Sequence, residues 1–224
     1  MKQDNFEEIV NKYLALRNHD HRYTSFDYCY NYFKTENDLT KDMEKSCFEL
    51  AFYLASWGMF RGASFLLQKS AKYFVKTIEY FNSLKNDSVD KCIWEIDVDN
   101  YNDENYKKIA KIYSDLYMLV MNFESRDVTL ITKIMLGVFG IVPAYDKYFC
   151  ESFKKISNER CAFTSLNKES LDIIKEFYID NKEAIDKLAS ETLTFDFISG
   201  EKTTINYPKV KIIDMYGFKL SMKE

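Results

Sequence analysis

Glycine and proline are scarce in this sequence, and their scarcity limits the folds open to the chain more than any other feature. Only 6 Gly and 2 Pro occur among 224 residues, beside 17 Tyr and 18 Phe. Glycine and proline interrupt helices and supply the turns of strand-rich folds, so a chain with few of them favours helices. Each buried aromatic side chain also removes a large apolar area from water. We therefore expect a mainly α-helical, bundle-like fold with many aromatic side chains in its core.

Apolar residues recur at helical spacing along most of the chain, with strand-like alternation only near the end. We expect one domain over residues 1–224, formed by a helical body (1–190) and by a β-hairpin plus a short helix (191–224). The helices are expected at about 4–17, 23–33, 40–81 with a bend or a break near Trp57 and Gly58, 103–123, 127–140, 143–156, 168–189 and 209–218. Residues 91–105 lack a helical stripe and suggest an extended piece that ends in a turn.

The charge and cysteine content restrict the partners and the compartment. A net charge of −4 argues against a strong nonspecific grip on nucleic acid or on an anionic membrane, although a local basic patch stays open. The five cysteines form no CxxC pair, and "MKQDNFEEIV" is not a signal peptide. We therefore expect reduced thiols in a cytoplasmic protein.

The apolar stretch "LAFYLASWGMFRGASFLL", residues 50–67, is eighteen residues long and contains one charge, Arg61. A membrane-spanning helix needs about 20 apolar residues and does not favour a central arginine. We therefore expect no membrane span, and we interpret the stretch as the central helix of a bundle. Four small residues would share one face of it: Ala51, Ala55, Gly58 and Gly62.

Arg61 would then be a cation inside the core, where an unpaired guanidinium is costly. One interpretation is a structural ion pair or a side chain that reaches the surface. The other is a pocket that recognises an anionic ligand or a protein partner. For that pocket we predict Arg61, Trp57, Asp27 and Asp214 as ligand-binding residues, in an intracellular bacterial binding or interaction protein.

Several common chemistries lack their residues. His19 and His21 are the only histidines, and no further metal-ligand motif accompanies them. The acidic run at 97–103 does not have the glycine that a calcium loop requires. The chain also lacks a phosphate loop and the motifs of histidine-based triads. We therefore predict no metal and no cofactor, and leave open whether the protein is an enzyme.

The segment "TKIMLGVFGIVPAYDKYF", residues 132–149, ends one helix at a glycine and places a carboxylate at the start of the next. It resembles the catalytic segment of helix-hairpin-helix DNA glycosylases. The resemblance implies that Asp146 is the catalytic aspartate and that Lys133 acts beside it, in a nucleic-acid-processing enzyme. The preceding "ESRDVTL" lacks the glycine-rich turn of that family, and Asp146 could instead only cap its own helix.

The enzyme hypothesis makes a geometric prediction. Asp146 should line an open cleft, with Lys133 or Arg61 a few ångströms away and with basic residues such as lysines 147, 154 and 155 around its rim. Such a rim would supply the local positive charge that the whole chain does not have. An Asp146 that only caps its own helix beneath packed side chains would contradict the hypothesis.

Taken as a whole, the chain resembles an uncharacterised family of bacterial proteins. The lines that carry this resemblance are "SFDYCYNYF", "LAFYLASWGMFRGASFLLQKS", "TKIMLGVFGIVPAYDKYF" and "KVKIIDMYGF". The resemblance implies an α-rich domain in a bacterial, phage-defence or mobile-element context, and it implies no mechanism. A defence effector that acts through protein contacts is therefore a third hypothesis.

Overall fold

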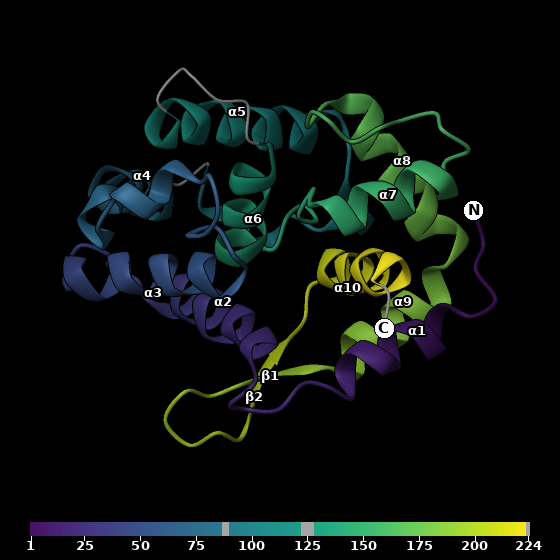
Figure 1. Ribbon diagram of the computed structural model, residues 1–224, viewed down its shortest axis with the longest axis horizontal. Helices are drawn as coiled ribbons and strands as arrows, with labels where there is room; N and C mark the ends of the chain where they lie inside the picture. Colours follow the sequence, from purple (N-terminus) through teal and green to yellow (C-terminus); the bar gives the residue numbers. More distant parts are fainter. Residues whose placement is uncertain (87–89, 122–127, 223–224) are drawn as a thin grey trace.

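The computed structural model describes residues 1–86, 90–121 and 128–222, and it confirms the mainly α-helical fold (Figure 1). The α-helices are α1 (Phe6–Leu14), α2 (Ser25–Thr35), α3 (Met43–Ser56), α4 (Val75–Asn86), α5 (Asp103–Val120), α6 (Val128–Phe139), α7 (Lys147–Ile156), α8 (Lys168–Asp180), α9 (Lys182–Glu191) and α10 (Lys209–Ser221). Short 3₁₀ helices are η1 (Arg22–Thr24), η2 (Phe65–Gln68), η3 (Ala71–Phe74), η4 (Asp90–Glu95) and η5 (Val98–Asn100). Strands β1 (Leu193–Phe195) and β2 (Lys202–Asn206) pair antiparallel, as the alternation predicts.

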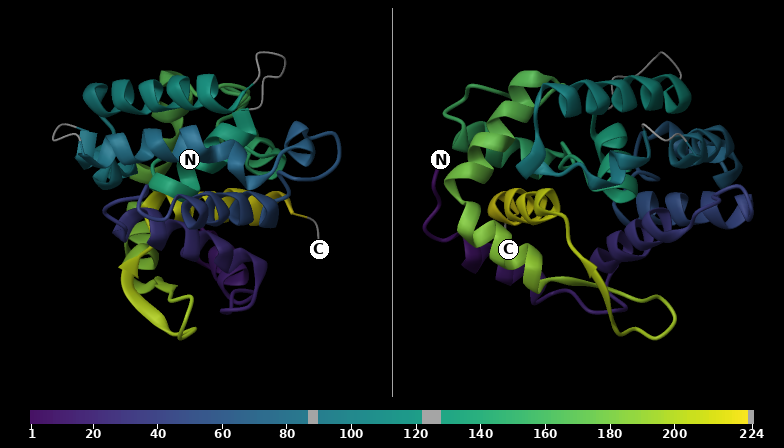
Figure 2. Two further views of the ribbon diagram at one scale, coloured as in Figure 1. Left: turned by 90° about the vertical axis from the view of Figure 1, so that its left-hand side faces the viewer. Right: turned by 180° about the vertical axis from the view of Figure 1, so that it is seen from behind.

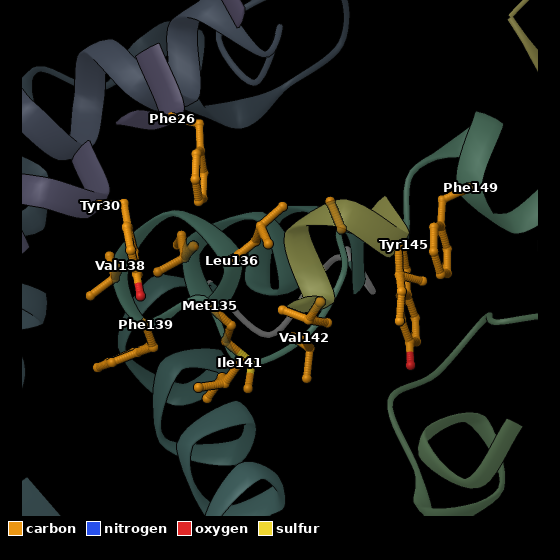
Figure 3. Close-up of a cluster of buried hydrophobic side chains, with 14 of the residues drawn as sticks. Phe26, Tyr30, Met135, Leu136, Val138, Phe139, Ile141, Val142, Tyr145 and Phe149 are labelled. Atoms are coloured by element: carbon orange, nitrogen blue, oxygen red, sulfur yellow. The ribbon is translucent and has the colours of Figure 1, made fainter. Parts of the chain in front are cut away.

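Helices α6 and α10 form the centre of the molecule. Every residue of 130–139 in α6 and of 210–218 in α10 is buried. Helix α6 packs against α2, α3 and α5, while α10 packs against α1, α7 and α9. Figure 3 shows Phe26 and Tyr30 of α2 beside Met135 and Phe139 of α6. A helix that is apolar on all sides belongs in such a core, so α6 has the central position that the sequence suggested for 50–67.

The helical block predicted over 40–81 breaks near Trp57 and Gly58, as one of the two expected alternatives required, but the interpretation of 50–67 as a single helix is wrong. Helix α3 ends at Ser56, and residues 57–64 form turns with left-handed backbone at Gly58 (φ +78°) and Gly62 (φ +63°). Glycine adopts this conformation without a steric penalty and commonly ends helices. The two exposed phenylalanines of α3, Phe48 (55% exposed) and Phe52 (66% exposed), show that α3 lies at the surface.

Three other element predictions need correction. The helix expected from Pro143 begins at Lys147, because Asp146 is its N-cap. The helix expected over 168–189 is two helices that meet at Asn181, whose side-chain amide donates to the Phe177 carbonyl. Residues 91–105 contain 3₁₀ turns rather than an extended piece. The helix ends expected near 123 and 127 lie outside the described residues.

Residues 191–222 contribute more to the core than a terminal hairpin and short helix would. The connection between β1 and β2 extends from the helical body in both views of Figure 2, whereas α10 returns to its centre. Asp27 anchors the hairpin, since its carboxylate accepts hydrogen bonds from Arg17, from Tyr207 and, at 2.9 Å, from the Phe195 amide. None of the helices in the described part of the chain is long and apolar enough to cross a lipid bilayer.

Candidate functional site

The sequence between α6 and α7 brings Lys133 and Asp146 together. Lys133 lies in the middle of α6 and is only 4% exposed. The chain turns at Gly140 (φ +69°), where a Cβ atom would lie 2.6 Å from Pro208, so only glycine fits. It then returns to Asp146 at the start of α7. The Lys133 Nζ atom lies 3.4 Å from Asp146 Oδ2.

The two carboxylate oxygens of Asp146 make different contacts. Its Oδ1 accepts the Phe149 amide at 3.0 Å and so caps α7, while Oδ2 faces Lys133. The side chain is 15% exposed. A carboxylate at a helix N-terminus is stabilised by the helix dipole and by the capping bond. The cap therefore holds the second oxygen at a fixed place next to the amine.

A second lysine–aspartate pair lies on α10. Lys211 Nζ is 2.8 Å from Asp214 Oδ2, and the two side chains are 1% and 9% exposed. Asp214 Oδ1 accepts the Ala144 amide at 3.0 Å, which ties α10 to the segment that leads to Asp146. Buried charges persist only where they are paired and hydrogen-bonded, and both pairs meet this condition.

Aromatic side chains cover the two ammonium groups. Lys133 Nζ lies 5.2 Å and Lys211 Nζ 5.1 Å from the centre of the Trp57 ring. Tyr23 stacks on Trp57 with ring centres 5.4 Å apart, and the ring of Phe218 meets Trp57 at 88°. Cations near the face of an indole are stabilised by its quadrupole. The site is thus a buried polar cluster with an aromatic cover.

Burial changes the acid–base behaviour of Lys133. Removal from water lowers the pKa of Lys133, and the Lys211 charge acts in the same direction. The negative charges of Asp146 and Asp214 and the hydrogen bond to Asp146 oppose this change only in part, so the pKa stays below its ordinary value. A lowered pKa increases the fraction of neutral amine, which is the nucleophilic form of lysine.

The site is closed. Nine residues surround its centre: Tyr53, Trp57, Lys133, Leu136, Ala144, Asp146, Lys211, Asp214 and Phe218. The space between them has a volume of about 10 Å³, which is at the lower limit for one water molecule. The prediction of an open cleft at Asp146 is therefore wrong for this conformation. Lysines 147, 154 and 155 are exposed on α7, but none of them lines the enclosed space.

The structure separates the predicted site residues into two groups. Lys133, Asp146, Trp57 and Asp214 meet in one cluster, whereas Asp27 and Arg61 lie elsewhere. Asp27 is buried, but its cationic partner is Arg17.

Arg61 is exposed, so the prediction of a core arginine is wrong. Its side chain folds against Gly58, where a Cβ atom would lie 2.6 Å from Arg61 Nε. Among the described residues, no carboxylate lies within ion-pair distance of Arg61.

Sequence reasoning missed Lys211 and Tyr53. The Tyr53 hydroxyl donates to the Lys133 carbonyl at 3.1 Å and so holds α3 against α6. Lys211 and Asp214 stand three residues apart in the apolar run "KVKIIDMYGF". Opposite charges at this spacing share a helix face, and an apolar run around them indicates burial. This signal could have identified the second pair.

No group of three or more metal-ligating side chains occurs within the described ranges. Comparisons of the chain with protein-family models, with curated proteins and with solved structures give no match. The resemblance of residues 132–149 to DNA glycosylases therefore stays a prediction, and the geometry of the cluster is the basis for any functional proposal.

Proposed function

We propose that this protein is a nucleic-acid-processing enzyme that uses the amine of Lys133 and the carboxylate of Asp146. The observation that carries the proposal is a buried lysine of lowered pKa, 3.4 Å from a carboxylate that a helix cap holds in place. Burial favours the neutral amine, which can attack an electrophilic carbon, and the carboxylate is placed to accept the proton that the amine then loses. The glycosylase-like segment at 132–149 suggests the carbon, which is C1′ of a nucleotide.

The proposed chemistry assigns each group a role. The neutral amine of Lys133 attacks C1′, the bond from C1′ to the base breaks, and the base leaves with the bonding electrons and takes up a proton. Asp146 stabilises the positive charge that develops at C1′, accepts the first proton that the amine loses and passes it to the leaving base. The C1′–O4′ bond of the sugar ring then breaks, the second amine proton passes to O4′, and an imine remains between Lys133 and C1′.

Exposed lysines on α7 are in keeping with a nucleic-acid partner. Lysines 147, 154 and 155 are exposed on α7, the helix that Asp146 caps. Trp57 covers the two lysine amines together with Tyr23 and Phe218, and aromatic rings such as these provide the faces on which bases stack once a site opens. An anion pocket at Arg61 finds less support, because the exposed Arg61 lies outside the cluster.

The proposal also includes a cellular compartment and a biological context. The four described cysteines, Cys29, Cys47, Cys150 and Cys161, are free thiols, which is in keeping with a reducing cytoplasm. The whole-chain resemblance suggests a bacterial host and a role in phage defence or in a mobile element. In that setting, the anionic partner would be foreign or damaged nucleic acid.

Borohydride trapping tests the proposal. The full chain is incubated with oligonucleotides that contain an abasic site or a deaminated, oxidised or alkylated base, and sodium borohydride then reduces any imine to a stable amine. We expect a covalent complex with the wild type and with Lys76→Met, a control that removes an exposed lysine of α4. We expect none with Lys133→Met. Trapping that is unaffected by Lys133→Met, or absent from every substrate, would refute the proposal.

A second experiment measures binding of the same oligonucleotides at two salt concentrations. Contacts with phosphates release counterions, so affinity should fall steeply as salt increases. Absence of salt-sensitive binding would exclude nucleic acid as the partner.

A further inference from the structure

The closed site raises the question of where a substrate base would lie. The space that the nine lining residues enclose, about 10 Å³, holds at most one water molecule. A nucleobase can therefore reach Lys133 only if one of the surrounding side chains leaves. The backbone conformation around the site indicates which side chain can leave.

Most of the lining side chains cannot move without disrupting the core. Lys133 and Leu136 lie on α6, and Lys211, Asp214 and Phe218 lie on α10, the two central helices. Tyr53 lies within α3, and its ring packs directly on Gly137.

Trp57 is different, because it follows the last residue of α3. It begins the turns of residues 57–64, which contain two glycines with positive φ, and residues 61–63 are exposed. Trp57 is itself only partly buried.

The surroundings of Trp57 form a slot for a flat ring. Tyr23 is nearly parallel to the indole, at an interplanar angle of 8°, and the edge of the slot is closed by Phe218. The ammonium groups of Lys133 and Lys211 lie about equally far from the indole centre, at 5.2 and 5.1 Å.

The indole leaves hydrogen-bond donors in this slot without acceptors. Its Nε1 atom is buried and has no hydrogen-bond acceptor among the described residues. A buried donor without a partner costs stability. Indole also offers no acceptor to the two ammonium groups, which are strong donors. A heterocycle with carbonyl oxygens would fill the same volume and accept hydrogen bonds from the lysines.

We propose that the position of the Trp57 indole is the binding site for the substrate's base, a flat heterocycle that carries a carbonyl group. Trp57 leaves this position with residues 57–64 when the substrate enters. The inference takes the substrate's chemistry from the proposed function, but the slot itself can be tested without catalysis.

A ring-replacement experiment tests the slot. Trp57→Ala removes the indole, and the thermal unfolding midpoint of the full chain is measured with hypoxanthine, which has a carbonyl group, and with purine, which has none. Trp94→Ala is the matched control, because Trp94 is buried and its Nε1 donates to the Val138 carbonyl at 3.0 Å. Binding of a ligand to the folded state raises the midpoint.

We expect hypoxanthine to raise the midpoint of Trp57→Ala at least twice as much as purine does, and to leave Trp94→Ala unchanged. No shift in Trp57→Ala, or an equal shift in both variants, would overturn the inference. If Trp57→Ala does not fold, Trp57→Leu serves in its place with the same expected order of ligands.

Fluorescence tests the displacement itself. The chain has two tryptophans, so Trp94→Phe leaves Trp57 as the only emitter. On binding an oligonucleotide that contains hypoxanthine, acrylamide quenching of Trp57 should increase severalfold. A trapped covalent complex with unchanged quenching would overturn the displacement and leave the proposed function standing. Hypoxanthine binding to Trp57→Ala without any trapped complex would support the slot and overturn the function.

Discussion

The Lys133 side chain is more deeply buried than that of Asp146. Removal of the Asp146 charge and removal of the Lys133 charge should therefore change the free energy of unfolding by different amounts. Asp146→Asn keeps a side chain that can cap α7 but removes the negative charge next to Lys133. Lys133 is 4% exposed, so its ammonium group would be left without its nearest counter-charge. Loss of one partner of a buried ion pair costs about 3–5 kcal/mol.

The pKa of lysine in the unfolded chain limits how much stability the Asp146→Asn variant can lose. Without its counter-charge, the ammonium group of Lys133 can lose its proton and become neutral. Its pKa in the unfolded chain is 10.5. At about 1.36 kcal/mol per pH unit, deprotonation at pH 7 costs about 5 kcal/mol, and at pH 9 about 2 kcal/mol. The nearby Asp214 charge reduces the cost further. We therefore expect Asp146→Asn to lose about 3–5 kcal/mol at pH 7 and no more than about 2 kcal/mol at pH 9.

Lys133→Met should behave differently. The thioether side chain has a similar length and carries no charge, and the Asp146 carboxylate keeps the Phe149 amide and its contact with water. Because burial lowers the pKa of Lys133, the folded state binds the lysine's proton less tightly than the unfolded state does. Removal of that charge should change the free energy of unfolding by no more than about 1 kcal/mol.

Urea unfolding followed by circular dichroism at pH 7 and pH 9 measures both variants, each as a difference from the wild type at the same pH. Other groups that titrate in this range cancel in the difference. Lys154→Met serves as the control for loss of an exposed lysine. Equal losses for the two variants, or a loss for Asp146→Asn that does not shrink at pH 9, would refute the interpretation of Lys133 as a buried cation held by Asp146.

Two other predictions concern the rest of the fold. Burial raises the pKa of Asp97 to about 6, although the amides of Val98, Lys209 and Val210 oppose the change by donating to it. The folded state then binds this proton more tightly than the unfolded state. Stability should therefore fall by up to about 3 kcal/mol as the pH rises from 4 to 6, and Asp97→Asn should flatten that part of a urea-midpoint profile; an unchanged profile would contradict this. Gly137→Ala would place a Cβ atom in steric clash with Tyr53 Cε1 and should cost about 1–3 kcal/mol in urea unfolding; a neutral effect would show that α3 and α6 are less closely packed.

The helical class was predictable because apolar periodicity is a local property of the chain. Helix α6 could be found from "DVTLITKIMLGVFG" alone, since an apolar run closed by glycine is self-contained. A bend or a break near Gly58 was predicted too, but the sequence does not decide between a bend, which continues the helix, and a left-handed turn, which ends it. The interpretation of 50–67 as one helix placed Arg61 in the predicted core, whereas the turn places it at the surface.

The candidate site was predictable in part for the same reason. Lys133 and Asp146 stand on consecutive helices joined by a short return, so one segment of sequence contains both. Trp57 and Asp214 were predicted as partners of Arg61, whereas the fold places them around Lys133. Lys211 was missed because nothing local shows that the last helix returns to the centre of the molecule.

Identification of the residue that reacts would test the central claim most directly. The full chain is trapped with borohydride on an oligonucleotide that contains an abasic site, digested, and examined by mass spectrometry. We predict that the sugar remnant is found on Lys133 and that Lys133→Met abolishes the adduct without unfolding the protein. An adduct spread over the exposed lysines, or located on Lys211 alone, would contradict the account.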